Sequence, residues 1–356
     1  MIDSSDVRKI NINRIRTLMW RGGEFTKLSV AKATGFSVAT SNTLLNELAN
    51  TGEIIGEKRH LNGVGRGSIV YRINEQFESI LCLRIDISSD EIRYLHCDIL
   101  SMLGKQLFKE TKQYNKLDEQ TVIHTILELI EQYTNISCII IGICGIVDEG
   151  VVYMSDIPEL EGIPLEKKIA SVTNVPLYIA YDCQFRVYGE YKRSGYSMET
   201  LSLVYAVKNV LSGTASVVEN IILNGRNGFA GMTGYMSFDI DREELIKKVA
   251  TNDAAKYVAD SVIALITILN PNEIVYAGNV FDAKVLEEIR QICMKKLPER
   301  IIPSFRILEN QATCYLDGMY YKAIEIKTEF PKRFIWKNSD YLKKARKYGH
   351  FTGYEN

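Results

Sequence analysis

Apolar residues near the N-terminus recur at helical spacing and then stop at a pair of glycines. They predict one amphipathic helix that ends near Gly22-Gly23, and its apolar positions are Val7, Ile10, Ile15, Leu18 and Met19. A second helix is predicted from about Lys27 to Thr34. After Gly35-Phe36, Ser37 is a good N-cap for a third helix that runs to about Asn50. This order predicts a helix-turn-helix.

The third predicted helix has one apolar and one polar side. Steps of 100° per residue place one set inward, namely Val38, Ser41, Leu44, Leu45 and Leu48, and a second set outward, namely Ala39, Thr43, Asn46 and Asn50. Small polar side chains suit a DNA major groove, so Asn42, Thr43 and Asn46 are candidate base readers. Ser37 and Ala39 are included as candidate DNA contacts. An ordinary solvated helix face is the alternative.

Two short strands follow the third helix. Residues 53–58 and 68–72 are predicted to pair across the glycine-rich, basic connection 59–67. Lys58, Arg59 and Arg66 would then reach DNA phosphates or a minor groove. A solvated hairpin is the alternative, but with the preceding helices we interpret residues 1–78 as a winged helix-turn-helix DNA-binding domain.

From about Ile80 the pattern changes to apolar strand-like runs that alternate with helices. This alternation predicts an α/β body with mixed sheets. Strands are expected at 81–86, 91–98, 138–143, 177–180, 201–207 and 217–223, with a last one at 273–277, and helices at 119–133, 183–192 and 254–269.

Composition adds a modest charge asymmetry. The 356 residues are 46% hydrophobic and 24% charged, as expected for two or three soluble domains. Residues 1–78 hold 11 Lys and Arg against 8 Asp and Glu, whereas the whole chain has a net charge of −1. With no apolar run long enough to span a bilayer and a polar start, we expect a cytoplasmic protein. The seven cysteines lack metal-ligand spacing and are expected to be buried thiols.

Several landmarks occur in an order that is typical of one family. They are Gly65-Arg66-Gly67, Leu83-Arg84-Ile85-Asp86, the run 142–148, Tyr181-Asp182, the run 227–236 and the run 270–278. The chain resembles the repressor branch of the ROK family (repressors, open reading frames and kinases). The resemblance implies a two-lobed, actin-like and ribonuclease H-like sugar-kinase fold for residues 79–326.

The sequence departs from the family's phosphate-binding turns. Where family kinases carry Asp-x-Gly-Gly-Thr, this chain has Asp86-Ile87-Ser88-Ser89-Asp90, and Asp90 adds negative charge where phosphate is expected. The second turn is glycine-rich in the family, but the run 213–220 retains little of that. Tight ATP binding is therefore not expected, and no cofactor is predicted.

The sugar pocket that the resemblance implies has changed as well. Its expected residues are Gly145, Tyr181, Asp182, Met232 and Tyr235, of which Asp182 alone retains a family role, that of general base. We interpret Asp182 as a vestige and predict no catalytic residue. Met232 and Tyr235 replace a sugar-binding Glu and a zinc-binding His, and residues 237–252 contain neither Cys nor His, so no metal is expected. The pocket either binds a changed effector or is filled as core.

The basic tail, residues 327–356, extends beyond the resemblance. Its cations are Lys332, Arg333, Lys337, Lys343, Lys344, Arg346 and Lys347. A narrow apolar stripe of Trp336, Tyr341, Leu342 and Ala345 suggests docking on the body or on a second subunit. Simple solvation and additional DNA contact are the alternatives.

These observations favour a sequence-specific DNA-binding regulator that represses carbohydrate-use genes. The chain is not expected to be an enzyme. A homodimer or higher homo-oligomer is expected, because two half-sites multiply specificity. A sugar-like small molecule is the expected effector. The alternatives are an ATP-dependent sugar kinase that uses Asp182 as base, and a protein-interaction module with a pseudokinase body.

Overall fold

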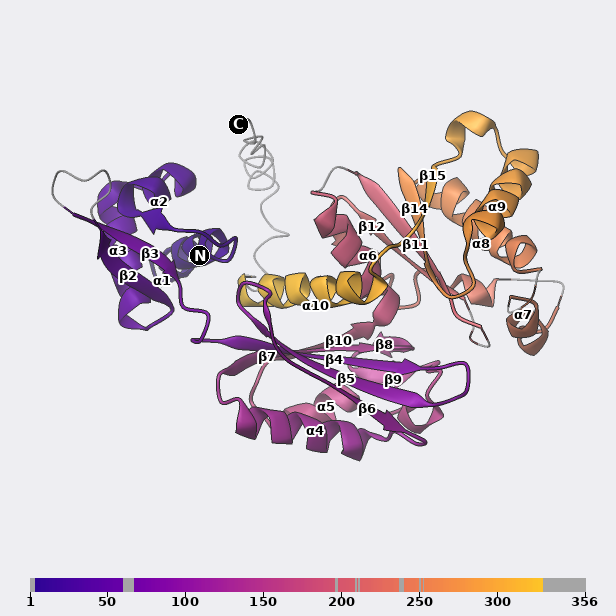
Figure 1. The fold of residues 1–356 in the computed structure, drawn as a ribbon, viewed down its shortest axis with the longest axis horizontal. Helices are drawn as coiled ribbons and strands as arrows, with labels where there is room; N and C mark the ends of the chain where they lie inside the picture. The colour runs from indigo at the N-terminus through magenta and orange to yellow at the C-terminus, as the bar shows by residue number, and fades with distance from the viewer. Residues whose placement is uncertain are drawn as a thin grey trace. The chain divides into compact units, whose positions relative to one another are not determined.

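The computed structural model describes residues 4–59, 67–195, 198–208, 210, 212–236, 240–249, 251 and 253–328. The chain divides into two compact units (Figure 1). One unit comprises the chain up to Asn74 together with the chain from Ile324 onward, and the other comprises Glu75–Ala323. Each unit is described by itself.

Up to Asn74, the described residues of the first unit form three helices and a small sheet, and the end of α10 (Gln311–Thr328) also belongs to this unit. Its elements are α1 (Ser4–Met19), β1 (Phe25–Thr26), α2 (Lys27–Thr34), α3 (Val38–Asn50), β2 (Ile54–Arg59) and β3 (Ser68–Ile73). Thr26 and Ser29 form a reciprocal capping box at the start of α2, and Gly35 ends that helix with a left-handed φ of 74°. The Ser37 hydroxyl accepts the Thr40 backbone N–H and caps α3. The predicted ranges of α2 and α3 are confirmed.

Buried apolar residues come from all three helices of this unit. Ile15 and Met19 of α1, Val30 of α2, and Leu45 and Leu48 of α3 are all buried, and the three helices contact one another. The strands form an antiparallel sheet in the order β1-β3-β2. The expectation that Val38 lies inside is wrong, since its side chain is 49% exposed. Val38 is the first residue of α3, and a helical side chain leans toward the N-terminus, here past the end of the core.

The second unit begins with a five-stranded mixed sheet in the order β10-β7-β4-β5-β6. Its strands are β4 (Ser79–Ile87), β5 (Arg93–Ser101), β6 (Gln106–Tyr114), β7 (Ile136–Ile143) and β10 (Leu177–Tyr181). Strands β4, β7 and β10 are parallel, whereas β5 and β6 are antiparallel. Figure 1 shows α4 (Glu119–Gln132) and α5 (Leu165–Ala170) together along this sheet. A hairpin of β8 (Ile146–Asp148) and β9 (Val151–Tyr153) lies beside β10.

The second sheet of this unit repeats the plan of the first. Its order is β15-β14-β11-β12-β13, with β15, β14 and β11 parallel and β12 and β13 antiparallel. The strands are β11 (Thr200–Ala206), β12 (Gly213–Val218), β13 (Ile221–Ile222), β14 (Glu273–Gly278) and β15 (Ser304–Ile307). The helices are α6 (Asp182–Arg193), α7 (Arg242–Val249), α8 (Ala254–Leu269), α9 (Ala283–Lys296) and the part of α10 (Gln311–Thr328) up to Ala323. The mixed-sheet α/β prediction is confirmed, and the range of α8 agrees with its predicted range.

Two predictions about this unit are wrong. Residues 217–223 were expected to form one strand, but Gly213–Val218 is the buried strand β12, Glu219 and Asn220 form a turn with positive φ, and Ile221–Ile222 is the separate strand β13. The alternation of Thr214, Ser216 and Val218 with apolar residues is compatible with a strand, and Ser216 bonds Ser202 inside the sheet at 2.8 Å. Strand β14 is not the last, since β15 pairs with it. In the part of the chain that the structure describes, no helix is long and apolar enough to cross a membrane.

Candidate functional site

The exposed face of α3 carries most of the predicted base readers. Ala39, Thr43 and Asn46 are exposed, and Ser37 is exposed at the cap. The Thr43 hydroxyl donates to the Ala39 carbonyl at 3.2 Å, and the Tyr71 hydroxyl donates to Asn46 Oδ1 at 3.4 Å. These contacts hold the two side chains in fixed directions while their outer surfaces face solvent.

Asn42 lies at the border of this face. It is half-buried, and its Oδ1 is buried with no hydrogen-bond partner among the described residues. A buried carbonyl without a partner is unfavourable, so this amide is placed less well for base contact than those of its neighbours. The structure therefore separates Asn42 from Thr43 and Asn46.

The basic residues lie at the end of β2. Lys58 and Arg59 are both exposed, whereas Arg66 lies outside the described residues. The Arg59 guanidinium contacts Glu24 and Glu57 at 2.7 Å each. Ion pairs between exposed side chains contribute little, so a phosphate can replace either carboxylate as the partner of Arg59.

A further arginine fixes the turn before α3, and sequence reasoning missed it. Arg14 donates to the Thr34 carbonyl at 3.1 Å, and its guanidinium lies over the Phe36 ring, 5.0 Å from the centroid. In addition, Arg16 makes a bidentate pair with Glu53, with both distances 2.7 Å. Both contacts join residues at least 20 positions apart, so no local signal in the sequence could reveal them.

In the second unit, Asp182 is held by an arginine of its own helix. Its carboxylate is 2% exposed and accepts from Arg186 Nε at 3.0 Å. The same guanidinium lies 3.5 Å from Asp86 and between the rings of Tyr205 and Tyr315, at 4.4 and 4.3 Å from their centroids. Burial raises the pKa of Asp182 against the lowering effect of Arg186. A general base must reach a substrate proton, and this carboxylate is occupied by a cation.

The loop after β4 closes on itself. The Ser88 N–H donates to the Ile92 carbonyl at 2.9 Å, and the Ile92 N–H donates to the Ser88 hydroxyl at 3.2 Å. Glu91 has a left-handed φ of 59°. These N–H groups are used inside a hairpin turn, whereas a phosphate-binding turn would present them outward.

The predicted sugar-pocket residues do not surround one cavity. A Cβ added to Gly213 would lie 1.8 Å from the Tyr181 hydroxyl, so Tyr181 occupies the space that is free because residue 213 is glycine. Met232 packs against the same hydrophobic core as Tyr181. Tyr235 packs on Phe229 with 5.5 Å between centroids. Gly145 lies against Ser155, whose Cα would be 2.9 Å from an added Cβ. These contacts favour the filled-core alternative at this place.

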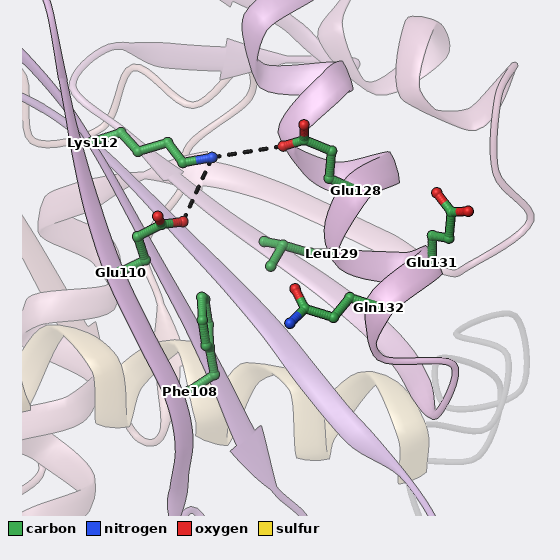
Figure 2. A pocket seen from close by; sticks show the side chains of 7 residues that line it. All are labelled: Phe108, Glu110, Lys112, Glu128, Leu129, Glu131 and Gln132. Atoms are coloured by element: carbon green, nitrogen blue, oxygen red, sulfur yellow. Dashed lines mark ion pairs between the residues drawn. The ribbon is translucent and has the colours of Figure 1, made fainter.

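A groove of about 500 Å³ lies between β6 and α4 (Figure 2). Figure 2 shows Lys112 between Glu110 and Glu128, and the Nζ lies 3.6 Å from each carboxylate. Phe108 and Leu129 supply apolar surface, while Glu131 and Gln132 complete the lining. None of the site residues predicted from the sequence lies here.

A second cavity, of about 310 Å³, lies beside the edge strand β10. Among the residues of the predicted pocket, Tyr181 lines it and Gly145, Asp182, Met232 and Tyr235 do not. Within the described ranges no three His, Cys, Asp or Glu side chains are grouped as metal ligands. The prediction that the chain needs no metal stays a prediction.

Comparison with known proteins agrees with this architecture. The chain is 23% identical over 225 residues to the xylose repressor of Caldicellulosiruptor bescii, which covers 60% of this chain and 55% of that protein. It is 21% identical over 246 residues to the xylose repressor of Bacillus subtilis, covering 67% of this chain and 63% of that protein. The matches thus span little more than half the length of these curated relatives.

Solved structures share the fold. A ROK family transcriptional regulator, described as a homolog of the E. coli MLC protein, has a TM-score of 0.68 at 17% identity, covering 89% of this chain and 96% of that chain. The ROK hexokinase of Thermus thermophilus has a TM-score of 0.56 at 16% identity, covering 70% of this chain and 100% of that chain. The model of the ROK family matches residues 83–248. This stretch of the chain is therefore similar to the ROK family.

Proposed function

We propose that this chain is a sequence-specific DNA-binding repressor of carbohydrate-use genes, and that its first unit is a winged helix-turn-helix. The observation that carries the proposal is the exposed polar face of the capped helix α3, beside the paired strands β2 and β3, with Lys58 and Arg59 exposed at the end of β2. Helix, turn and hairpin in this order are the parts that such a domain uses to read a major groove and to hold the phosphates beside it. The names of the matching xylose repressors support the same role.

The way in which α3 is packed against the rest of the unit suits base readout. Leu44, Leu45 and Leu48 anchor its inner face in the core, while the Arg14 contacts fix the turn that precedes it. Base contacts discriminate only when donor and acceptor positions are fixed relative to the groove. Thr43 and Asn46 therefore act as the principal readers, and Ala39 offers a methyl group to a thymine.

The body acts without phosphoryl transfer. Its candidate base, Asp182, is paired with Arg186, and its first loop uses N–H groups for its own hairpin. Where family kinases carry Gly-Gly-Thr, this loop has Ser88, Ser89 and Asp90, so side chains replace the glycines and Asp90 adds negative charge where phosphate would lie. The similar structures include a kinase, so the fold alone does not separate an enzyme from a pseudokinase. We therefore base the pseudokinase assignment on the contacts of Asp182 and of the first loop.

The operator is read by a homodimer. One recognition helix contacts only a few base pairs, and a two-fold pair of helices reads two half-sites separated by one helical turn or a multiple of it. A sugar-like effector would set the balance between bound and free operator. The names of the matching xylose repressors favour a small sugar in this role.

Selection of random double-stranded DNA by the purified full chain tests the proposal. We expect enrichment of an inverted repeat and its loss in the Thr43→Ala, Asn46→Ala double variant. A matched control is Thr267→Ala, an exposed threonine near the end of α8 whose hydroxyl also bonds its own helix. If the wild-type protein enriches no motif, or if the double variant enriches the same motif equally well, the proposal fails.

A further inference from the structure

The cavity beside β10 is a built pocket of about 310 Å³ that none of the chemistry above uses. Four segments line it: the end of β8 with the β8–β9 turn, the start of α5, strand β10 with the start of α6, and the loop 224–228. The lining residues are Val147, Asp148, Glu149, Gly150, Glu166, Tyr178, Ile179, Ala180, Tyr181, Gln184, Asn224, Gly225, Arg226, Asn227 and Gly228.

The walls of this cavity are fixed by close backbone packing. Gly150 has a φ of 78°, and a Cβ there would lie 2.6 Å from Glu166, whose N–H donates to the Gly150 carbonyl at 3.1 Å. Gly228 has a φ of 76°, and a Cβ there would lie 2.8 Å from the Val147 carbonyl oxygen. The fold itself forms the hollow, and no swing of a surface side chain is needed to open it.

Gln184 supplies a polar group that a ligand can contact. Its side chain lines the cavity, and the residue is only 4% exposed. No hydrogen bond joins its amide to another described residue, and its amide atoms are not among the fully buried polar atoms that lack a partner, so they are open to the cavity. A polar molecule in the cavity can both donate to this amide and accept from it.

The charges select the kind of molecule. Asp148, Glu149 and Glu166 line the cavity with no ion-pair partner within the described ranges, while Arg226 is the one cation in the lining. The surplus of negative charge repels phosphates and carboxylates, whereas carboxylate oxygens accept hydrogen bonds from hydroxyl or ammonium groups. Asn224 and Asn227 add amides that both donate and accept, and Tyr178 adds an aromatic surface.

From these contacts we propose that the cavity binds a neutral or cationic polyhydroxylated molecule of monosaccharide size. Its volume lies at the lower end for small-molecule sites. The site differs from the place implied by the kinase resemblance, with which it shares only Tyr181. Binding stands on the cavity alone, and the role of the ligand as effector rests on the proposed repressor function.

Calorimetric titration of the full chain without DNA tests the site. The probes are D-xylose, D-glucosamine and, as the anionic comparison, D-glucose 6-phosphate. We expect D-xylose or D-glucosamine to bind at least about tenfold more tightly than the phosphate. Gln184→Leu should weaken that binding about tenfold or more, and Glu166→Gln, which alters an exposed side chain, should weaken it several-fold. Glu131→Gln, in the separate β6–α4 groove, should change nothing.

Three results would overturn the proposal. One is the absence of heat for both uncharged and amino probes, and another is tightest binding of the phosphate. The third is loss of binding in Met232→Ala while Gln184→Leu and Glu166→Gln bind as tightly as the wild type. That result would show that the ligand binds at the sugar pocket implied by the kinase resemblance. Because no DNA is present, a failure here differs from failure of operator selection, and either can occur without the other.

Discussion

At the scale of single residues, Arg186 joins two acidic side chains from separate segments. It neutralises the buried Asp182 and contacts Asp86 from a position between two tyrosine rings. We expect Arg186→Met to lower the free energy of unfolding by about 3–5 kcal/mol, because it leaves a buried carboxylate without its partner. Urea denaturation measures this change.

Two comparisons sharpen that experiment. Arg193→Met alters an exposed arginine of the same helix, paired with Asp317 at 3.6 Å, and should cost no more than about 1 kcal/mol. The double variant Asp182→Asn, Arg186→Met should recover part of the loss. If Arg186→Met unfolds at the wild-type urea concentration, the buried pair does not stabilise the fold as described.

Lys192 makes stability depend on pH in the alkaline range. Burial, together with the nearby positive charge of Lys322, lowers its pKa to about 8, whereas an unfolded lysine has a pKa of about 10.4. Between these values the unfolded chain binds more protons, so this group increases stability as pH rises from about 8 to about 10. The stability of the wild type relative to Lys192→Met should therefore increase from pH 8 to pH 9.5 in urea titrations. A constant difference would contradict the lowered pKa.

At the scale of elements, the sequence predicted the helices whose ends and buried faces are set by neighbouring residues. Helices α2 and α3 follow from caps, a glycine and an apolar stripe, and all of these act within one turn. Strand β6 was missed because it lies at a sheet edge and carries Lys109, Glu110 and Lys112, as edge strands commonly do. The cavity at β10 could not be predicted, since Asp148, Gln184 and Arg226 come from separate segments that only the tertiary fold brings together. The same holds for Asp86 and Arg186, which are 100 positions apart.

The N-cap of α3 can be separated from DNA contact by two substitutions. Ser37→Ala should cost about 1 kcal/mol of unfolding free energy, because the Thr40 N–H loses its acceptor. Ser37→Asp should retain the cap and the stability, but its negative charge at the groove should weaken operator binding. Thermal melting together with gel-shift titration checks both effects. Equal operator affinity for Ser37→Asp and wild type would remove Ser37 from the DNA interface.

At the scale of the whole molecule, two sheets of the same order build the body, and charge distinguishes it from the N-terminal residues. Residues 1–78 hold 11 cations against 8 anions in a chain of net charge −1. Cationic side chains of the first unit would release counterions from the DNA phosphates that they contact. The number of counterions released determines how steeply affinity falls with salt. Substitutions of basic residues in the first unit should therefore change the salt dependence of operator binding, whereas substitutions in the body should leave it unchanged.

We expect Lys58→Gln to reduce the slope of log affinity against log salt by about one, because one phosphate contact is lost. Arg59→Gln should reduce it by a similar amount, since its exposed pairs with Glu24 and Glu57 yield to phosphate. Lys208→Gln, an exposed lysine after β11, should leave the slope unchanged. Fluorescence anisotropy at a series of salt concentrations gives each slope. A slope that responds to Lys208 but not to Lys58 would move the phosphate contacts to the body and away from the hairpin.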